Sequence, residues 1–251
     1  GEIVYLTIAS TGNALPFGSL SVGAAYATSG GINSPTRAVL HSFESSASPQ
    51  MLQTEFVSFD TLGNGQDFGE LSVARNAASG CSSSTRGLCH GGLTPSLSDV
   101  IDYCTIATLG DFTDFGNLSV ARRSGASCSS STRGVHGAGT TPTNLNTIDF
   151  VTIASAGNAT DFGDAQNVRA NGAGCSNTTR MVIGGGGVSP SGYLAVMEFI
   201  TISTTGNATD FGDMPQIVYS LRGCSASHIR GNFNGGAGYP NTVYLNVIQS
   251  I

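Results

Sequence analysis

The stretch CSSSTRGVHGAGTTPTNLNTIDFVTIASAGNATDFG, residues 128–163, is the clearest copy of a unit that recurs along the whole chain. Its closing dipeptide, Phe-Gly, returns at intervals of 51, 47, 47 and 49 residues. The recurring phenylalanines are Phe17, Phe68, Phe115, Phe162 and Phe211. A fixed period of this length is typical of propellers, solenoids and other arrays. The repeat therefore decides the fold class.

Each unit contains one run of β-branched and aromatic residues that predicts a strand. The run occurs six times, at residues 3–10 (IVYLTIAS), 55–60, 101–108, 148–155, 197–204 and 243–250. Three more extended segments complete a unit: the Phe-Gly element, a small-residue segment, and a strand that opens on Arg and ends on glycines. Both faces of the strand at 148–155 carry apolar residues, as in a strand covered on both sides. Four short strands in a unit of about 50 residues predict one blade of an all-β propeller.

The order of these segments resembles the kelch repeat, and the match is best over residues 121–163. All five units fit, so the resemblance covers essentially the whole chain. The chain departs from the kelch pattern because it has no Trp, and the phenylalanine of Phe-Gly stands where kelch units usually carry one. The sequences TRG, IDYCTIA and GNATDFG resemble kelch-like proteins of tailed bacteriophages and environmental bacteria.

Five units predict a five-bladed β-propeller of kelch-like, four-stranded blades, forming a single domain over residues 1–251 with repeats of 47–51 residues. In kelch-like blades the segment before the TRG strand lies innermost. Here that segment reads SGCSSS at residues 79–84. Small side chains fit the narrow axis of such a ring.

One strand is surplus, because the IVYLTIAS-type strand occurs six times and five blades seat only five. Residues 2–10 and 242–250 both align with residues 147–155. The sixth strand can extend an edge within the subunit, be donated to a neighbouring molecule, or be the cut end of a longer protein. The residues expected in these two assembly strands are Ile3, Val4, Tyr5, Leu6, Val243, Tyr244, Leu245 and Val247.

Charge and composition exclude several classes of partner. Charged residues make up 10 % of the chain, against about a quarter in ordinary proteins, and the net charge is -6. With no basic patch, nucleic acid and anionic membranes are not expected partners. No apolar run approaches the length of a membrane helix, so membrane insertion is not expected. The chain begins with Gly and has no signal peptide, which predicts a mature or trimmed form.

Arginines and acidic residues occupy repeated positions. One Arg fills the same position in every unit, and this ring comprises Arg37, Arg86, Arg133, Arg180 and Arg230. It could bind an anion or an acidic sugar, or it could tie each blade to its neighbour through backbone carbonyls. The scaffold interpretation is favoured, since a residue needed in every blade is more simply structural. Possible partners are the acidic residues Glu55, Asp102, Asp149 and Glu198, and a second Arg position is filled by Arg75, Arg122 and Arg169.

The cysteines fall into two groups. Cys81, Cys128, Cys175 and Cys224 share the innermost position and are expected to be small buried residues. Cys89 and Cys104 each replace an apolar residue on consecutive strands of one blade. They predict a cross-strand disulfide, with two reduced core thiols as the alternative, and a bond would imply an oxidising compartment.

No catalytic, cofactor or metal site is expected. Asp-Phe-Gly recurs at Asp67, Asp114, Asp161 and Asp210, but a protein kinase needs a lysine and the chain has none, so the motif predicts a turn and a packing Phe. His41, His90, His136 and His228 have no partner at metal-ligand spacing and are expected at the surface. Calcium at Asp161/Asp164 or Asp210/Asp213 is a weaker alternative. Sequons at Asn117, Asn158, Asn177 and Asn207 are interpreted as coincidence in a bacterial or phage protein.

These features predict a non-enzymatic structural or interaction protein. It would be a subunit of an extracellular or virion-associated assembly, such as a phage tail or fibre component, or a filament of identical copies joined by terminal-strand exchange. The alternative is a glycan-binding module for host or surface attachment, using loops 92–99, 139–146, 186–194 and 232–242 with Tyr193 and Tyr239. An oxidase or lyase on a kelch-type propeller is the third hypothesis, for which no convergent acid, base or metal set is found.

Overall fold

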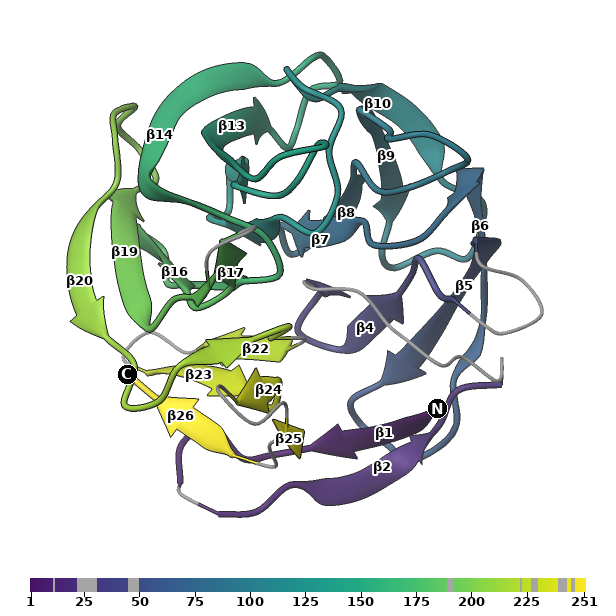
Figure 1. Cartoon of the computed structure of the whole chain (residues 1–251). Coiled ribbons are helices and arrows are strands. Elements are labelled where there is room, and N and C mark those ends of the chain that lie inside the picture. Colours follow the sequence, from purple (N-terminus) through teal and green to yellow (C-terminus); the bar gives the residue numbers. More distant parts are fainter. Residues whose placement is uncertain are drawn as a thin grey trace.

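The computed structural model describes residues 1–10, 12–21, 31–44, 50–188, 192–221, 223–226, 230–238, 243–244 and 247–251. All regular secondary structure in these ranges is β-strand, as the sequence predicted. The sheets follow one another around a ring, which is the arrangement of a β-propeller (Figure 1). Within the described ranges, no helix is long and apolar enough to cross a membrane.

Four sheets are complete, and each has four antiparallel strands in chain order. Sheet 1 comprises β3 (Ile32–Asn33), β4 (Arg37–Leu40), β5 (Met51–Ser58) and β6 (Gln66–Arg75). Sheet 2 comprises β7 (Ser79–Ser82), β8 (Arg86–His90), β9 (Val100–Thr105) and β10 (Thr113–Asn117). Sheet 3 comprises β11 (Ala126–Ser129), β12 (Arg133–Gly137), β13 (Leu145–Thr152) and β14 (Thr160–Arg169). Sheet 4 comprises β15 (Ala173–Ser176), β16 (Arg180–Gly184), β19 (Val196–Thr201) and β20 (Thr209–Asp213).

The other described strands form smaller sheets. Sheet 5 has three strands: β22 (Gly223–Ala226), β23 (Gly231–Asn234) and β26 (Ile248–Ser250). The β1–β2 hairpin pairs β1 (Glu2–Tyr5) with β2 (Leu15–Ser19). A further two-stranded sheet pairs β17 (Gly187–Val188) with β18 (Gly192–Tyr193). A further three-stranded sheet comprises β21 (Val218–Tyr219), β24 (Ala237–Gly238) and β25 (Val243–Tyr244). The described residues thus form four four-stranded blades, not the five that the sequence predicted, because sheet 5 and the hairpin are each only part of a blade.

The β1–β2 hairpin lies between sheet 5 and sheet 1 (Figure 1). Towards sheet 1, the amide of Gly63 donates to the carbonyl of Phe17 at 3.1 Å. The same bond joins complete sheets, since Gly110 donates to the carbonyl of Phe68 at 2.9 Å. Towards sheet 5, Arg230 Nη1 donates to the carbonyl of Ile8 at 3.1 Å. The hairpin therefore has the place of the third and fourth strands of a further blade.

The predicted alignment of residues 242–250 with residues 147–155 is wrong by five positions. In sheet 3, Gly134 lies opposite Val151, whereas in sheet 5 the equivalent Gly231 exchanges backbone hydrogen bonds with Ile251. Ile248 consequently corresponds to Ile148. The sequence signal was the match of LNVI at 245–248 to LNTI at 145–148, which the stronger β-branched character of 243–250 concealed.

The Phe-Gly dipeptide lies in a bulged strand, so the predicted extended segment is confirmed, whereas the turn expected at Asp-Phe-Gly does not form there. The register shifts at this point in sheets 2, 3 and 4, and the phenylalanines of the first three sheets, Phe68, Phe115 and Phe162, are buried. The glycine that follows has positive φ, for example 146° at Gly116. A Cβ on Gly116 would lie 2.5 Å from the carbonyl oxygen of Gly157 in the next sheet. Only glycine fits both demands, so the dipeptide recurs because each outer strand packs under the following turn.

The hydrophobic core lies between neighbouring sheets. One cluster joins Cys128 and Val135 of sheet 3 to Met181 and Ile183 of sheet 4. Small side chains face glycines across these junctions: a Cβ on Gly134 would lie 2.8 Å from Cys81 Sγ of sheet 2. This agrees with the expectation that Cys81, Cys128 and Cys175 are small buried residues. The side chain of Cys224 lies outside the described residues.

Candidate functional site

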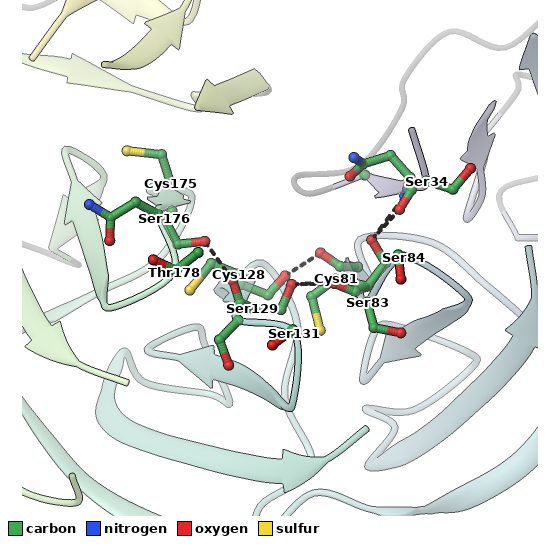
Figure 2. A pocket seen from close by; sticks show the side chains of 18 of the residues that line it. Ser34, Cys81, Ser83, Ser84, Cys128, Ser129, Ser131, Cys175, Ser176 and Thr178 are labelled. Carbon is green, nitrogen blue, oxygen red and sulfur yellow. Dashed lines mark hydrogen bonds between the residues drawn. The ribbon is translucent and has the colours of Figure 1, made fainter. Parts of the chain in front are cut away.

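A cavity of about 980 Å³ lies among the innermost strands and is the candidate site (Figure 2). Its walls are the first strands of the complete sheets with the turns that follow them, and Ile8 and Phe59 also line it. The lining residues of the described chain are neutral, and most are serines, glycines and cysteines. The part of the cavity wall that the structure describes is therefore lined mainly with hydroxyl groups, together with the thiols of Cys81, Cys128 and Cys175.

Serines in this wall tie the sheets together. Ser82 Oγ donates to the carbonyl of Asn33, Ser129 Oγ to that of Ser82, and Ser176 Oγ to that of Ser129, at 2.8, 2.6 and 2.9 Å. Figure 2 shows this chain of contacts from sheet 1 to sheet 4. In the turns, the Ser83 and Ser130 hydroxyls bind their own backbone, and Ser84, Ser131 and Thr178 are exposed at the cavity mouth. Sequence reasoning assigned these serines to packing and missed the inter-sheet bonds.

The repeated arginines of the second strands also join neighbouring sheets. Arg37, Arg86 and Arg133 each donate through Nη1 to a carbonyl of the next sheet, at 3.0, 2.9 and 2.9 Å. Their guanidinium groups lie over an aromatic ring of their own third strand, 4.3–4.6 Å from its centroid. Arg180 stacks in the same way on Phe199, at 4.7 Å. These bonds are those that the scaffold interpretation requires.

The acidic position pairs with the second arginine position, not with the ring of Arg37 and its equivalents. Arg75 binds Asp102 at 2.7 Å, Arg122 binds Asp149 at 2.9 Å, and Arg169 binds Glu198. Each pair joins one sheet to the next and is fully or almost fully buried. Serines also donate hydrogen bonds to these carboxylates. Ser119, for example, donates to Asp149 through both its amide and its hydroxyl. The pairs are inter-sheet clamps. Their signal in the sequence was a recurring separation between the arginine and the acidic residue, of 27 residues in the first two pairs and 29 in the third.

Where sheet 4 meets sheet 5, both the arginine position and the acidic position are occupied by neutral residues. Val218 stands where Arg75, Arg122 and Arg169 stand in the other units, and its carbonyl accepts the equivalent bond from Gly186. Opposite it, Gln249 takes the place of Asp149, as the pairing with Phe233 shows. The junction of sheets 4 and 5 is thus neutral where the three preceding junctions are charged.

The histidines are buried, and the prediction that they lie at the surface is wrong for His41, His90 and His136. The rings of His90 and His136 face each other across the junction of sheets 2 and 3, with centroids 5.3 Å apart. Burial, with His41, Arg75 and Arg122 nearby, lowers the pKa of His90 to about 3. Burial, Arg122 and His90 lower the pKa of His136 well below its usual value. His228 lies outside the described residues.

At other junctions, different residues take the places of the facing rings of His90 and His136. His41 of sheet 1 faces Cys89 of sheet 2, with 3.4 Å between Nδ1 and Sγ. Burial would raise the pKa of Cys89, but Arg75 and His41 outweigh it and lower this pKa to about 7. At the junction of sheets 4 and 5 the pair is Gly184 and Phe233, and a Cβ on Gly184 would lie 3.1 Å from Phe233 Cζ. Cys89 is completely buried, so its acidity does not make it an accessible nucleophile.

Cys89 and Cys104 are both free thiols in the structure. The assumption that they lie opposite each other is wrong, because Cys89 pairs with Asp102 and Cys104 pairs with Gly87. They therefore stand on a diagonal of sheet 2. Burial raises the pKa of Cys104 to about 12, as expected for a thiol in an apolar core.

Two of the four sequon asparagines hold outer strands to the next turn. The Asn158 carboxamide oxygen accepts the amide of Asn117, and that of Asn207 accepts the amide of Asp164, each at 3.0 Å. Asn177 caps its own turn by accepting from the amides of Thr179 and Arg180. The repeat thus has a structural use for these asparagines. No group of three or more His, Cys, Asp or Glu side chains placed to hold a metal, calcium included, occurs in the described ranges.

The β1 strand is exposed although it has the sequence of a buried strand. Val4 is 55 % exposed, whereas Asp149 in the equivalent place is 1 % exposed. Tyr5 is 39 % exposed, and Ile3 and Leu6 are half-buried. Of the other expected assembly residues, Tyr244 and Val247 are exposed, the side chain of Val243 is not described, and Leu245 lies outside the described residues. This surface is the clearest departure from the pattern of the complete sheets.

The recurring polar side chains of sheets 1 to 4 are engaged mainly between sheets, and the cavity is lined by neutral groups. No family model matches the chain, and no curated protein matches it.

Proposed function

We propose that this protein is a non-enzymatic structural or interaction protein whose copies assemble through the exposed β1–β2 hairpin. The observation that carries the proposal is the environment of β1. Val4 and Tyr5 are 55 % and 39 % exposed, in a strand whose counterparts in sheets 1 to 4 are mostly buried. Apolar strands with an open edge are sites of strand addition.

A second copy of the same chain is the partner that this surface fits. In sheet 3 the strand β13, which has the same sequence pattern, pairs with the Arg strand β12 of its own unit. Strands of sheets 1, 2 and 4 are paired in the same way. The surface complementary to β1 is therefore one that this chain itself carries in every unit.

Three finer features belong to the same proposal. The blades are kelch-like, on the strength of the Arg-to-glycine strand and the aromatic third strand. The fifth blade is completed on assembly, which would restore the five blades implied by five repeats. The assembly is extracellular or virion-associated, such as a phage tail or fibre or a filament, which agrees with 10 % charged residues and a chain rich in Ser, Thr, Asn and Gly.

Light scattering and electron microscopy of the purified chain test the proposal. We expect the unaltered protein to form assemblies whose mass increases with concentration. The variant Val4→Ser/Tyr5→Ser should be monomeric with unchanged secondary structure. The matched control is Leu62→Ser/Leu109→Ser, which alters two side chains that are 65 % and 61 % exposed on turns of sheets 1 and 2. The control should still assemble, and dispersed monomers of the unaltered protein at all concentrations would refute the proposal.

Glycan attachment is the second candidate function, and one observation favours it. Tyr193 and Tyr219 stack with centroids 4.0 Å apart and planes inclined by 17°. They lie in or beside the loop at 186–194, one of the loops expected to meet a glycan, whereas Tyr239 lies outside the described residues. A glycan array probed with the unaltered protein and with Tyr193→Ala tests this function. Binding that is absent, or that Tyr193→Ala leaves unchanged, removes it.

A further inference from the structure

The β1–β2 hairpin has the side chains of the outer half of a blade. Tyr5 and Phe17 meet edge to face with centroids 6.1 Å apart. In the complete sheets the third-strand aromatic and the fourth-strand Phe meet in the same way, as in Phe150 and Phe162 at 5.9 Å. The hairpin therefore carries the aromatic pair that belongs to third and fourth strands, and no first or second strand pairs with it among the described residues.

Sheet 5 has the complementary inner half. Its strands β22 and β23 pair as first and second strands do, and Arg230 with Gly231 repeats the Arg-Gly of sheets 2 and 3. In sheets 1 to 4 the guanidinium lies over an aromatic ring of the third strand, at 4.3–4.7 Å. In β26 that place is taken by Ser250, which lies opposite Asn232. The aromatic residue of this position is instead present in β1, as Tyr5.

We propose that the β1–β2 hairpin of one molecule pairs with β23 of a second copy and replaces β26 there. The result is a complete four-stranded blade made from two chains. This inference rests on the assembly proposed above and names the strand that receives the hairpin. The register follows from sheet 3, where Val135 lies opposite Phe150, so that Asn232 would lie opposite Tyr5.

The exchange favours the hairpin for two physical reasons. β26 contributes three residues and is the outermost strand of sheet 5 among the described residues, whereas the hairpin adds two strands and closes that edge. The hairpin also places Tyr5 at the position that an aromatic residue fills in the third strands of sheets 1 to 4 and that Ser250 fills in β26. Val4 and Tyr5 would lose their exposure in the same step.

A second copy is the donor because the molecule's own hairpin lies one blade position away. Arg230 binds the carbonyl of Ile8 in the way that Arg86 binds that of Ile153 in the following sheet. If the hairpin paired with β23 of its own molecule, it would have to move by one blade position around the ring. The ion pairs that join sheets 1 to 4 oppose that movement. A hairpin from another molecule has only to displace an edge strand. Donor and acceptor surfaces differ, so repeated exchange builds an open chain of molecules or a closed ring of them.

Disulfide trapping between chains tests the inference. Protein carrying Tyr5→Cys is mixed with protein carrying Asn232→Cys, both with Cys224→Ser, and oxidised in air. We expect a covalent dimer on a non-reducing gel that disappears with reductant and whose linked peptides contain residues 5 and 232. The matched control mixes Ser250→Cys with Asn232→Cys. It tests the register now occupied by β26 and should give several-fold less dimer.

Three other outcomes would overturn the inference. If the double variant Tyr5→Cys/Asn232→Cys cross-links only within single chains, the molecule's own hairpin is the occupant. If light scattering detects assemblies but residues 5 and 232 are never linked, exchange into sheet 5 is refuted and the proposed function still stands. Monomers under all conditions would refute both. Circular dichroism of each variant establishes that it is folded before it is scored.

Discussion

The junction of sheets 2 and 3 and the junction of sheets 4 and 5 occupy equivalent places in the repeat and have different chemistry. The first is held by the buried pair Arg122–Asp149 and the facing rings of His90 and His136. The second has Val218 and Gln249 in place of the ion pair, and Phe233 against Gly184 in place of the histidines. Equivalent positions of the repeat therefore form each junction. They hold an ion pair and two imidazole rings at the first junction, and neutral side chains with a packed phenylalanine at the second.

Removing one charge from the polar junction should have the largest effect. Asp149→Ala leaves Arg122 buried without its carboxylate, and breaking such a pair costs about 3–5 kcal/mol. We expect the free energy of unfolding, measured by urea denaturation, to fall by about 4 kcal/mol. The matched change at the neutral junction, Gln249→Ala, should cost less than about 1 kcal/mol. Equal losses at both junctions would contradict the distinction drawn between them.

Truncating the apolar junction comes next. Phe233 is 1 % exposed and packs against Gly184, so Phe233→Ala creates a cavity that sheet 4 cannot fill. Losses for such a change are about 3–5 kcal/mol, and we expect a value near the lower end because sheet 5 has only three strands. Thermal unfolding followed by circular dichroism measures it. Restoring volume with Gly184→Ala in the same chain should recover part of the loss, and no recovery would mean that the two residues do not share one space.

Acid should weaken the polar junction and leave the apolar one unchanged. His90 and His136 have pKa values below that of an unfolded histidine, about 6.5, so the unfolded chain binds protons that the folded chain does not. Stability is therefore full above about pH 6.5 and falls as the pH drops towards 3, by up to about 1.4 kcal/mol per pH unit for each imidazole. The neighbouring charged groups Arg75 and Arg122 act in the same direction.

The matched variant for this pH dependence is His136→Ile, which installs the residue that Ile183 provides in sheet 4. Its unfolding free energy should depend less steeply on pH between 6.5 and 4 than that of the unaltered protein. Denaturant titrations at several pH values give both slopes. Identical slopes would show that His136 is not the buried titrating group.

The smallest effect on stability is expected at the exposed counterpart of Asp149. Val4 has the same place in the repeat but is 55 % exposed, so Val4→Thr should change the unfolding free energy by less than about 0.5 kcal/mol. A dilute sample measures this value without contribution from assembly. A loss above about 2 kcal/mol would indicate that β1 is buried in the isolated molecule.

The repeat, the all-β class and the ring of four-stranded sheets could be predicted from the sequence, because the Phe-Gly period and the third-strand pattern are local. The junctions could not. Arg122 and Asp149 are 27 residues apart, and only the placement of one sheet on the next brings them together. His90 and His136 look like surface residues in the sequence, since burial by the neighbouring sheet leaves no local signal. The prediction of five complete blades failed because, among the described residues, sheet 5 has no fourth strand and the β1–β2 hairpin has no first or second strand.

The contacts between an outer strand and the turn of the following sheet determine how this chain can be recombined. The contacting pairs Gly116 and Gly157, Arg122 and Asp149, and Asn117 and Asn158 all fall between residues 113 and 158. If a segment that begins at the fourth strand of one sheet and ends at the last turn of the next is exchanged between two related proteins, both members of each such pair therefore come from the same protein. Chimeras between related repeats should accept crossovers at these turns and should lose solubility when the crossover falls between sheets, where each half would meet a foreign neighbour.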